Sequence, residues 1–520
     1  MLHKMDARPA FAGLRRATSR RLAAVVIFGL AAAAAAAQSE PAPLASVSVE
    51  GSTVYAPADF FAAYRDRLGL PATRESARAI AAAIVGRYQA DGFARPEVRL
   101  DESLAAHGVM RISVFEPRIT RVTIEGTPGS YRADMERIAA GVTASVPLRR
   151  DAIREAVSEM LRLPGLTVSA STRRDGALPN AHELVLRAEF EQLTGYARAN
   201  NRGTEAVGPV FALGQVEVND PFGWGGAFGL VVAAASDPGE YLSGAIYAER
   251  PLGGGGTRGT VMAFQSHSAP NERPVNLTDE YARQHLTLRV TRPANARVSW
   301  SASLESEDLQ VDRDGTIVRD DRLRVLEGGL RAAWRTGEAT QVASAVELRK
   351  GLDALGAGLR ADDLANDPRS AGFLVTRLQL TSLTRMREDW SLRLDSFAQL
   401  SGDVLPDIER FKIGGERLGR GFEVAEIAGD KGLGGKVTLR RELGVAALTV
   451  GRPAAYGFYD IGAAWKNDAA GRESASTMGA GVALQGGRFA GYLELAKPLR
   501  GGDVEGKRGT SLFAELSCRF

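Results

Sequence analysis

The sequence predicts two small α/β repeats followed by a membrane-spanning antiparallel β-barrel of about sixteen strands. Three observations support this fold class. The N-terminal segment is basic and then apolar, which is typical of an exported protein. Helical periodicity near 3.6 residues occurs only before about residue 190. From residue 192 onward, apolar and polar residues alternate over segments of about ten residues, as in the strands of transmembrane barrels.

Composition excludes several classes of protein. Of the 520 residues, 44% are apolar and 24% are charged, which is typical neither of a disordered chain nor of a helical membrane protein. The 65 Lys and Arg nearly balance the 62 Asp and Glu, so no nucleic-acid partner is indicated. A single cysteine excludes an intramolecular disulfide, and five histidines leave little material for metal sites. No set of nucleophile, base and acid appears, so we expect no enzyme and no cofactor.

Residues 1–37 are predicted to form a signal peptide. Arginines at positions 15, 16, 20 and 21 precede an apolar run from 22 to 37, which ends in three alanines. This order of a basic region, a short apolar core and small residues is typical of a secretory signal. The alternative is a membrane anchor, but the run is short and rich in alanine.

Two repeats of about 70 residues are predicted at 46–117 and 118–190, each with the order β-α-α-β-β. In the first, a strand at 46–49 precedes a helix from Thr73 to Gly92, and strands follow at 97–100 and 109–115. In the second, a strand at 119–124 precedes a short helix near 135–139 and a longer one near 152–161. Its last strands are expected at 167–171 and 183–190. An exposed strand edge beside a helix can accept an extended polypeptide by strand addition, although the repeats could equally be spacers.

Residues 191–520 are predicted to form the barrel, since the segments alternate strictly and polar residues occupy one face. A soluble β-sandwich or β-helix is the alternative, but the signal peptide and the inward charges argue against it. Glycine clusters such as 253–256 are expected in turns, and strand glycines such as Gly229, Gly479 and Gly481 indicate curvature. The predicted strands lie near residues 194–200, 210–218, 226–235, 240–249, 258–267, 281–291, 296–306, 324–335, 340–350, 372–383, 389–401, 434–443, 455–466, 476–485, 488–498 and 510–520.

A long interruption at 402–433 is the candidate functional segment, because long loops in barrels usually line or plug the lumen. Two strands later, alternation directs Asp460 into the lumen, where a carboxylate requires a cation such as Arg420. From the residues alone, the simpler interpretation is that Arg420 stays solvated and that Asp460 bonds neighbouring strand side chains. The candidate residues are Gly414, Gly415, Arg420, Gly421 and Phe422 in the loop, and Phe458, Asp460 and Gly462 in the strand.

These motifs, with two repeats and sixteen strands, resemble the outer-membrane transporters of two-partner secretion, the hemolysin secretion/activation proteins of the ShlB/FhaC/HecB type. The resemblance covers nearly the whole mature chain and implies that the repeats are POTRA domains. It also implies that the loop tip lies in the lumen, where Arg420 pairs with Asp460. The terminal Phe520 resembles the residue by which barrel assembly machinery recognises such proteins.

The resemblance implies an outer-membrane translocase that secretes an unfolded partner exoprotein and contacts outer-membrane lipids. The POTRA domains would dock the exoprotein in the periplasm, and the barrel would be the conduit. The alternatives are a factor that inserts other barrels and, as a different class, a passive porin. Two features depart from the family pattern. Gly419 replaces an aliphatic residue, and only about eight residues precede Ser46 after cleavage, too few for a plug helix that spans the barrel at ~1.5 Å per residue.

Overall fold

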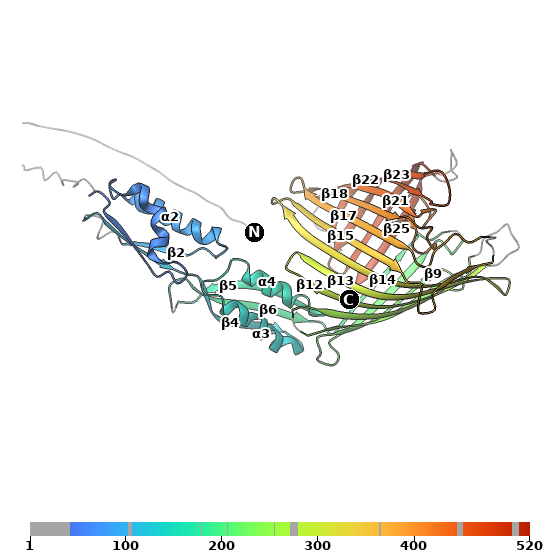
Figure 1. The fold of residues 1–520 in the computed structure, drawn as a ribbon, viewed down its shortest axis with the longest axis horizontal. Helices are drawn as coiled ribbons and strands as arrows, with labels where there is room; N and C mark the ends of the chain where they lie inside the picture. Colours follow the sequence, from blue (N-terminus) through green and yellow to red (C-terminus); the bar gives the residue numbers. More distant parts are fainter. Residues whose placement is uncertain are drawn as a thin grey trace, which may run out of the picture.

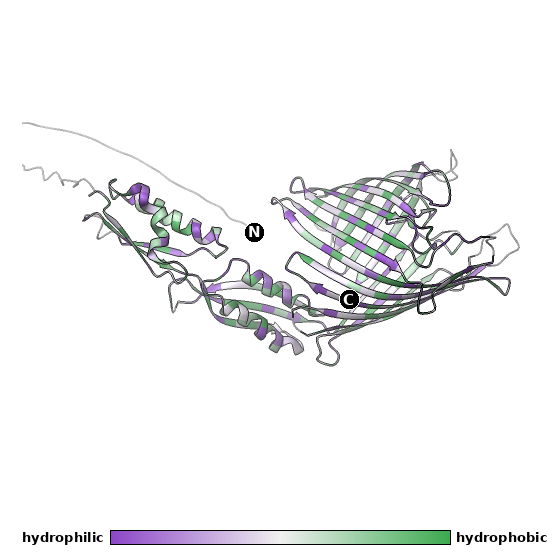
Figure 2. Ribbon diagram, in the orientation of Figure 1, coloured by the Kyte–Doolittle hydropathy of each residue, from purple (hydrophilic) through white to green (hydrophobic). Residues whose placement is uncertain are grey.

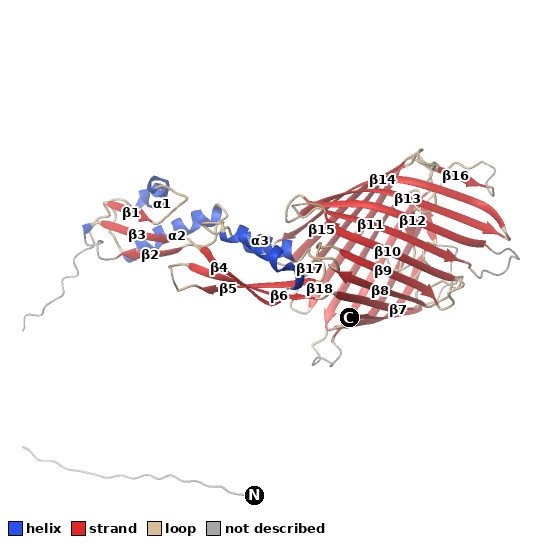
Figure 3. Cartoon of the chain, turned by 90° about the horizontal axis from the view of Figure 1, so that it is seen from below, coloured by secondary structure: helices blue, strands red, loops and turns tan. Residues whose placement is uncertain are grey.

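The computed structural model describes residues 42–520, apart from 102–106, 177, 205, 254, 271–278, 363–365, 445–450 and 502–508. The predicted signal peptide at 1–37 lies outside the described residues. Two small α/β repeats stand in a row at one end of a large β-barrel (Figure 1). Figure 3 shows the same arrangement from below, with the second repeat next to the barrel.

The first repeat is a three-stranded sheet covered by helices. Its strands are β1 (Ser46–Glu50), β2 (Glu97–Asp101) and β3 (Val109–Phe115), in the order β1-β3-β2, with β1 and β3 parallel. The short α1 (Phe61–Tyr64) and the long α2 (Arg74–Ala90) connect β1 to β2. In α2, Thr73 caps the first turn, and the apolar positions predicted from the periodicity contribute Ile80, Ile84 and Tyr88 to the core.

A cluster of buried hydrogen bonds adjoins this core. The Tyr88 hydroxyl donates to Glu116 Oε1 at 2.6 Å, and the backbone N–H of Thr53 donates to the same oxygen at 2.8 Å. Burial, followed by the bond to Glu116, raises the pKa of the Tyr88 phenol. The phenol therefore remains protonated and keeps donating at any pH near neutral.

The second repeat has the same topology. Strands β4 (Arg118–Thr127), β5 (Leu166–Arg174) and β6 (Ala181–Phe190) are ordered β4-β6-β5, with β4 and β6 parallel. Helices α3 (Arg132–Thr143) and α4 (Ala152–Met160) cover the sheet, so the short helix expected near 135–139 is longer than the periodicity indicated. Its core is separate from that of the first repeat. Among the described residues, no helix has the length and apolar character needed to cross a membrane.

The second repeat rests on two turns at the near end of the barrel. Ser130, just before α3, hydrogen-bonds to Asp220 in the turn that follows the second barrel strand. Arg258, at the start of the fifth barrel strand, donates to the carbonyl oxygens of Arg162 and Gly225, both at 3.2 Å. The Ser130–Asp220 and Arg258–Arg162 contacts join the repeat to the barrel beyond the covalent link at 191–192, and the Gly225 contact ties the two barrel turns together.

Within the described part of the chain, sixteen long antiparallel strands close the barrel, and the last of them pairs with the first. The short β16 (Gly358–Ala361) only extends β14 at its far end, and β15 pairs directly with β17. The sixteen are β7 (Leu193–Asn200), β8 (Phe211–Asn219), β9 (Ala227–Ala235), β10 (Tyr241–Pro251), β11 (Arg258–Ser268), β12 (Asp279–Pro293), β13 (Val298–Arg313), β14 (Thr316–Thr336), β15 (Thr340–Gly351), β17 (Leu374–Arg385), β18 (Trp390–Ser401), β21 (Lys431–Glu442), β22 (Arg452–Trp465), β23 (Glu473–Gly486), β24 (Phe489–Arg500) and β25 (Ser511–Arg519).

The observed strand ends lie within three residues of the predicted ones, except where β13 and β14 face each other. These two strands continue as a long hairpin to the turn at 314–315. The outward face of the extension is polar and carries no membrane-facing stripe, so dyad alternation did not reveal it. Along the strands, hydrophobic and hydrophilic residues alternate around the wall (Figure 2).

Three strand glycines, which we predicted to give curvature, also make room for aromatic rings. A Cβ atom at Gly229 would lie 2.1 Å from the Tyr247 ring, and one at Gly479 would lie 2.4 Å from the Phe458 ring. Gly481 stands in the same relation to Tyr456. Each glycine thus leaves a gap that an aromatic ring on the neighbouring strand fills.

Candidate functional site

The lumen loop, residues 402–430, connects β18 to β21 and folds back into the barrel. It contains a small hairpin, β19 (Phe411–Ile413) and β20 (Ile427–Gly429), and ends three residues before the predicted limit of 433. The loop forms an apolar cluster with inward-facing residues of the wall. The buried members of this cluster are Phe397, Phe411, Ile413, Leu418, Phe422, Ile427, Ala464 and Ala475.

Glycines on the wall make room for this hairpin. A Cβ atom at Gly432 would lie 2.0 Å from the Phe411 ring, and one at Gly434 would lie 2.3 Å from Leu418. Gly462, one of the predicted motif residues, faces Ile413, whose Cδ1 would lie 3.0 Å from an added Cβ. At these positions β21 and β22 therefore carry no side chains that would obstruct the loop.

The loop turn depends on glycine for its backbone shape. Gly414 has a φ of +121°, and a Cβ atom there would lie 1.8 Å from the Glu423 carbonyl oxygen. The N–H of Gly415, which also has a positive φ, donates to the Phe422 carbonyl at 3.1 Å. At the tip, a Cβ on Gly421 would lie 2.8 Å from Thr477 Cγ2, so the tip is in close contact with β23.

Arg420 and Asp460 form a buried ion pair that joins the loop tip to β22. The Asp460 side chain is fully buried, and that of Arg420 is 9% exposed. Arg420 Nη2 donates to Asp460 Oδ1 at 2.7 Å, and Nε donates to Oδ2 at 3.0 Å. The backbone N–H groups of Gly419 and Arg420 also donate to Oδ2, and the guanidinium stacks 3.5 Å from the centroid of the Phe458 ring. This bidentate, fully bonded geometry is what makes a buried ion pair tolerable.

The structure therefore excludes the interpretation in which Arg420 stays solvated. Asp460 bonds to the loop and not to its strand neighbours, because two backbone donors and a guanidinium converge on it. The close approach of the loop backbone also explains Gly419, where the family resemblance led us to expect an aliphatic residue. Gly419 has a positive φ, and an added Cβ would lie 3.1 Å from Ile413.

Glu494 on β24 extends the pair into a chain of four charges, which we call the tip network: Arg202, Glu494, Arg420 and Asp460. Arg420 Nη1 donates to Glu494 Oε2 at 3.3 Å, and Arg202 Nη2 donates to Glu494 Oε1 at 2.5 Å. Arg202 follows β7, the first barrel strand, and its guanidinium stacks 4.1 Å from the Phe513 ring of β25, the last strand. The tip network thus connects the loop to the strands on both sides of the barrel closure.

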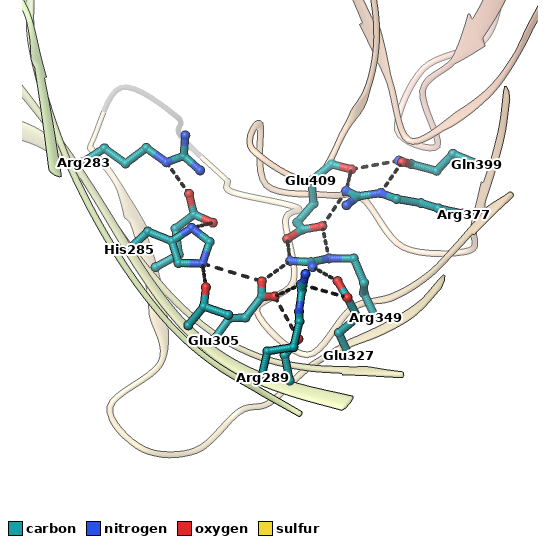
Figure 4. A network of polar contacts seen from close by, with 12 residues as sticks. Arg283, His285, Arg289, Glu305, Glu327, Arg349, Arg377, Gln399 and Glu409 are labelled. Carbon is teal, nitrogen blue, oxygen red and sulfur yellow. Dashed lines mark hydrogen bonds and ion pairs between the residues drawn. The ribbon is translucent and has the colours of Figure 1, made fainter. Parts of the chain in front are cut away.

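The start of the loop is held by a second cluster, which we call the wall network: Glu305, Glu327, Arg349, Arg377 and Glu409 (Figure 4). Glu409 lies in the loop and is 1% exposed. Arg349 donates to Glu409 through Nη2 at 2.7 Å and Nε at 3.0 Å, and Arg377 Nη2 donates to it at 2.7 Å. Arg349 also pairs with Glu305 at 3.0 Å and with Glu327.

The predicted assembly residue, Phe520, completes the closure of the barrel. Its backbone exchanges hydrogen bonds with Gly195 of β7, at 2.6 and 3.0 Å. A Cβ atom at Gly195 would lie 2.2 Å from the Phe520 ring, so the ring lies over this glycine on the outer face. Beyond the ladder, the Asn201 side chain donates to the Leu512 carbonyl and accepts from the Ala514 N–H.

Sequence reasoning found the two partners at the tip but missed the residues that surround them. Alternation along β24 and β15 already directs Glu494 and Arg349 inward, so a signal for them was present. Arg202 and Glu409 lie in loops, where no periodicity tells which way a side chain points. Their ion-pair partners lie between 32 and 292 residues away in the sequence.

A family model described as haemolysin secretion/activation protein ShlB/FhaC/HecB matches residues 185–486, more than half of the chain. The chain belongs to this family. Membership makes the protein an outer-membrane translocase of two-partner secretion, which exports a partner exoprotein, and places it in a transporter family. It favours secretion over the alternatives of a barrel insertion factor and a porin. A comparison with curated proteins found no match.

Solved structures share the fold of this member of the ShlB/FhaC/HecB family. CdiB from Escherichia coli is 18% identical with a TM-score of 0.72, and the alignment covers 94% of this chain and 92% of that one. CdiB from Acinetobacter baumannii is 14% identical with a TM-score of 0.60, covering 93% and 91%. BamA from Haemophilus ducreyi lacking POTRA domains 1–3 is 11% identical with a TM-score of 0.53, covering 92% and 100%.

Proposed function

We propose that the two POTRA-like repeats lie in the periplasm and deliver an unfolded exoprotein to the barrel, through which it passes to the cell surface. The observation that carries this proposal is the lumen loop, which is held inside the barrel at its tip and at its start. The polypeptide would displace this loop as it enters. Folding outside the cell would then prevent return, which gives the transport its direction without a chemical energy source.

The repeats offer open strand edges for docking. In the described residues, β2 has a strand on one side only, and so does β5. A groove of about 180 Å³ lies beside the β2 edge, lined in part by Ala77, Leu100 and Met110. Arg174 at the end of β5 pairs with Glu97 at the start of β2 at 2.8 Å, so the two edges adjoin. An extended segment added to these edges would gain backbone hydrogen bonds without a requirement for a particular sequence.

The Arg420–Asp460 pair is the proposed lock of the closed state. A buried ion pair whose hydrogen bonds are all formed holds the loop in one discrete arrangement. Breaking the pair leaves two charges without a partner in a site that is shielded from water. Arg420 and Asp460 are therefore proposed as the functional pair, with Gly414, Gly415 and Gly421 shaping the loop. Phe422 and Phe458 would support it by packing, and Gly462 by making room.

Phe520 is proposed as the residue that barrel assembly machinery recognises. Phe520 is half-exposed and directly follows β25, the last strand. Its backbone contact with Gly195 of the first strand helps to close the barrel. Phe520→Ala should therefore lower the amount of folded, heat-modifiable barrel in the outer membrane. An unchanged amount would show that the ring is dispensable for assembly.

Quantitative proteomics of the culture supernatant and outer membrane, comparing the host with a strain that lacks this protein, tests the proposed function. We expect one or a few large secreted proteins to disappear while other barrels are unchanged, and the missing protein would be the cargo. A broad fall in outer-membrane barrels would contradict the proposal and indicate an insertion factor. Unchanged proteomes would contradict both.

A further inference from the structure

The turn between β8 and β9 exposes a pair of large aromatic side chains beside the second repeat. Phe222 and Trp224 are more than half exposed, and their rings stack with centroids 4.5 Å apart. The Phe228 ring meets Phe222 edge to face at 5.7 Å. A soluble surface would seldom leave such a cluster open, whereas aromatic residues are favoured where a barrel meets the boundary of the membrane.

The cluster borders a groove on the outer face of the barrel. The groove has a volume of about 370 Å³, and its apolar lining includes Trp224, Phe228, Ala248, Leu252, Val261 and Leu288. Several of these side chains are exposed and alternate with lumen-facing residues such as Glu249, which pairs with Arg258. The groove therefore opens toward the membrane, and the small side chain of Ala248 gives it depth.

Arg250 lies at the mouth of the groove and carries a free positive charge. It is exposed, and its guanidinium lies 5.5 Å from the centroid of the Trp224 ring. Among the described residues, Arg250 forms no ion pair. Arg441 provides a contrast, since it stacks 5.4 Å from Trp390 at the same end of the barrel but also pairs with Asp389 at 3.0 Å. Arg250 is thus available to an anion that comes from outside the protein.

The position of the groove identifies the source of this anion. Trp300, Trp334 and Trp390 lie near the strand ends on the same side as Trp224, so the tryptophans mark one boundary of the membrane. At such a boundary, lipid phosphates lie next to the acyl chains. A guanidinium over an apolar groove matches both parts of an anionic glycerophospholipid.

We propose that this groove binds one anionic glycerophospholipid of the leaflet next to the repeats, with its phosphate on Arg250 and an acyl chain in the groove. The same turn holds Asp220, which bonds Ser130 of the second repeat, and Gly225, whose carbonyl accepts from Arg258. A bound lipid would therefore brace the turn on which the repeat rests. The inference depends on the membrane location of the barrel and is independent of which exoprotein is secreted.

Native mass spectrometry of the full chain tests this proposal, with dioleoyl phosphatidylglycerol and, for comparison, dioleoyl phosphatidylcholine as the added lipids. We expect the wild type to retain one phosphatidylglycerol about fivefold better than phosphatidylcholine, the preference that one basic side chain near an anionic headgroup provides. Arg250→Gln should abolish this preference. Ala248→Phe should lower retention of both lipids by filling the groove.

Two variants serve as matched controls, and heat-modifiable gel migration reports that every barrel is folded. Arg441→Gln removes an arginine that stacks on tryptophan but is already paired, and Ala263→Phe enlarges an outward residue outside the groove. Both should retain lipid as the wild type does. Equal retention of the two lipids by the wild type would overturn the proposal, and so would unchanged retention by folded Arg250→Gln.

Discussion

Single residues in the tip network act through alternation of charge. Asp460, Arg420, Glu494 and Arg202 follow one another as acid, base, acid and base, and all four side chains are less than 10% exposed. In such a chain each group stabilises the charges of its neighbours, because burial prevents water from solvating them. Removing one member therefore costs more than the same change on the surface.

Replacing Arg420 with alanine should leave Asp460 buried without a cation, at a cost of about 3–5 kcal/mol. We expect secretion of the exoprotein to fall while the barrel still assembles. Immunoblots of the supernatant and of the outer-membrane fraction would measure the two effects. Arg417→Ala is the control, since Arg417 lies three residues earlier, faces the Phe397 ring and forms no ion pair within the described residues. Normal secretion at normal abundance of Arg420→Ala would remove Arg420 from the mechanism.

Replacing Arg202 with alanine should weaken the loop from the opposite side of the network. Glu494 would lose its 2.5 Å partner, at a cost of about 2 kcal/mol for a hydrogen bond to a charged group. We expect a lower temperature of heat modification on gels and a partial loss of secretion. Arg198→Ala is the matched control, because Arg198 is 35% exposed and its pairs are 3.7 and 3.8 Å long. Equal effects of the two variants would show that Arg202 has no special role.

At the scale of elements, different types of interaction hold the lumen loop at different points. Its hairpin packs on apolar wall residues beside Gly432 and Gly434, its tip is held by Asp460, and its start is held by Glu409. Polar pairs fix one orientation, whereas apolar packing tolerates sliding. The ion pairs therefore specify where the loop lies, and the hairpin supplies the buried area.

Replacing Glu409 with glutamine should loosen the start of the loop. Arg377 would lose its carboxylate and Arg349 one of three, at a cost of about 3 kcal/mol. We expect larger or more frequent channel openings in planar lipid bilayers. Asp407→Asn, two residues earlier, is the control, because its side chain is 44% exposed and its ion pairs should contribute less than about 1 kcal/mol. Indistinguishable traces from the wild type and Glu409→Gln would contradict the wall network as an anchor.

The whole molecule is built from units with separate cores. The first repeat has its own buried cluster around Tyr88, the second has another around Met135, and the barrel follows as a closed wall. Contacts such as the Arg174–Glu97 pair join the units at exposed points. Each buried cluster therefore lies within one unit, and hydrogen bonds and ion pairs connect the units.

Removing residues 46–117 should leave the second repeat and the barrel folded, because their cores do not include the buried cluster of the first repeat. We expect the shortened protein to accumulate in the outer membrane in heat-modifiable form and the exoprotein to stay in the periplasm. Arg174→Ala, which removes one exposed ion pair between the repeats and leaves backbone hydrogen bonds such as Ala94 N–H to the Leu148 carbonyl in place, should secrete nearly normally. Full secretion by the shortened protein would show that the first repeat is not the docking site.

The sequence by itself determined the order of units and nearly all of the strands. A period of two or 3.6 residues is a local property, since it records which face of each element meets water, lipid or core. For the same reason it determined that Asp460 points inward. Arg420 could be named only as a candidate, because a loop has no periodicity that orients its side chains.

Only the tertiary structure decided how distant segments meet. The extension of the β13–β14 hairpin is polar on its outward face, while Val311 and Leu323 on the other face are buried, so no membrane-facing stripe marked its ends. The glycines beside Tyr247 and Phe458 were predicted to give curvature, and only their neighbours on the adjacent strand show that they also make room for aromatic rings. Closure of the barrel brings Arg202 to Glu494 from the opposite end of the chain, and the folding of the loop into the lumen brings Glu409 to Arg349 and Arg377. Such contacts depend on register and closure, which are properties of the whole wall and of no single segment.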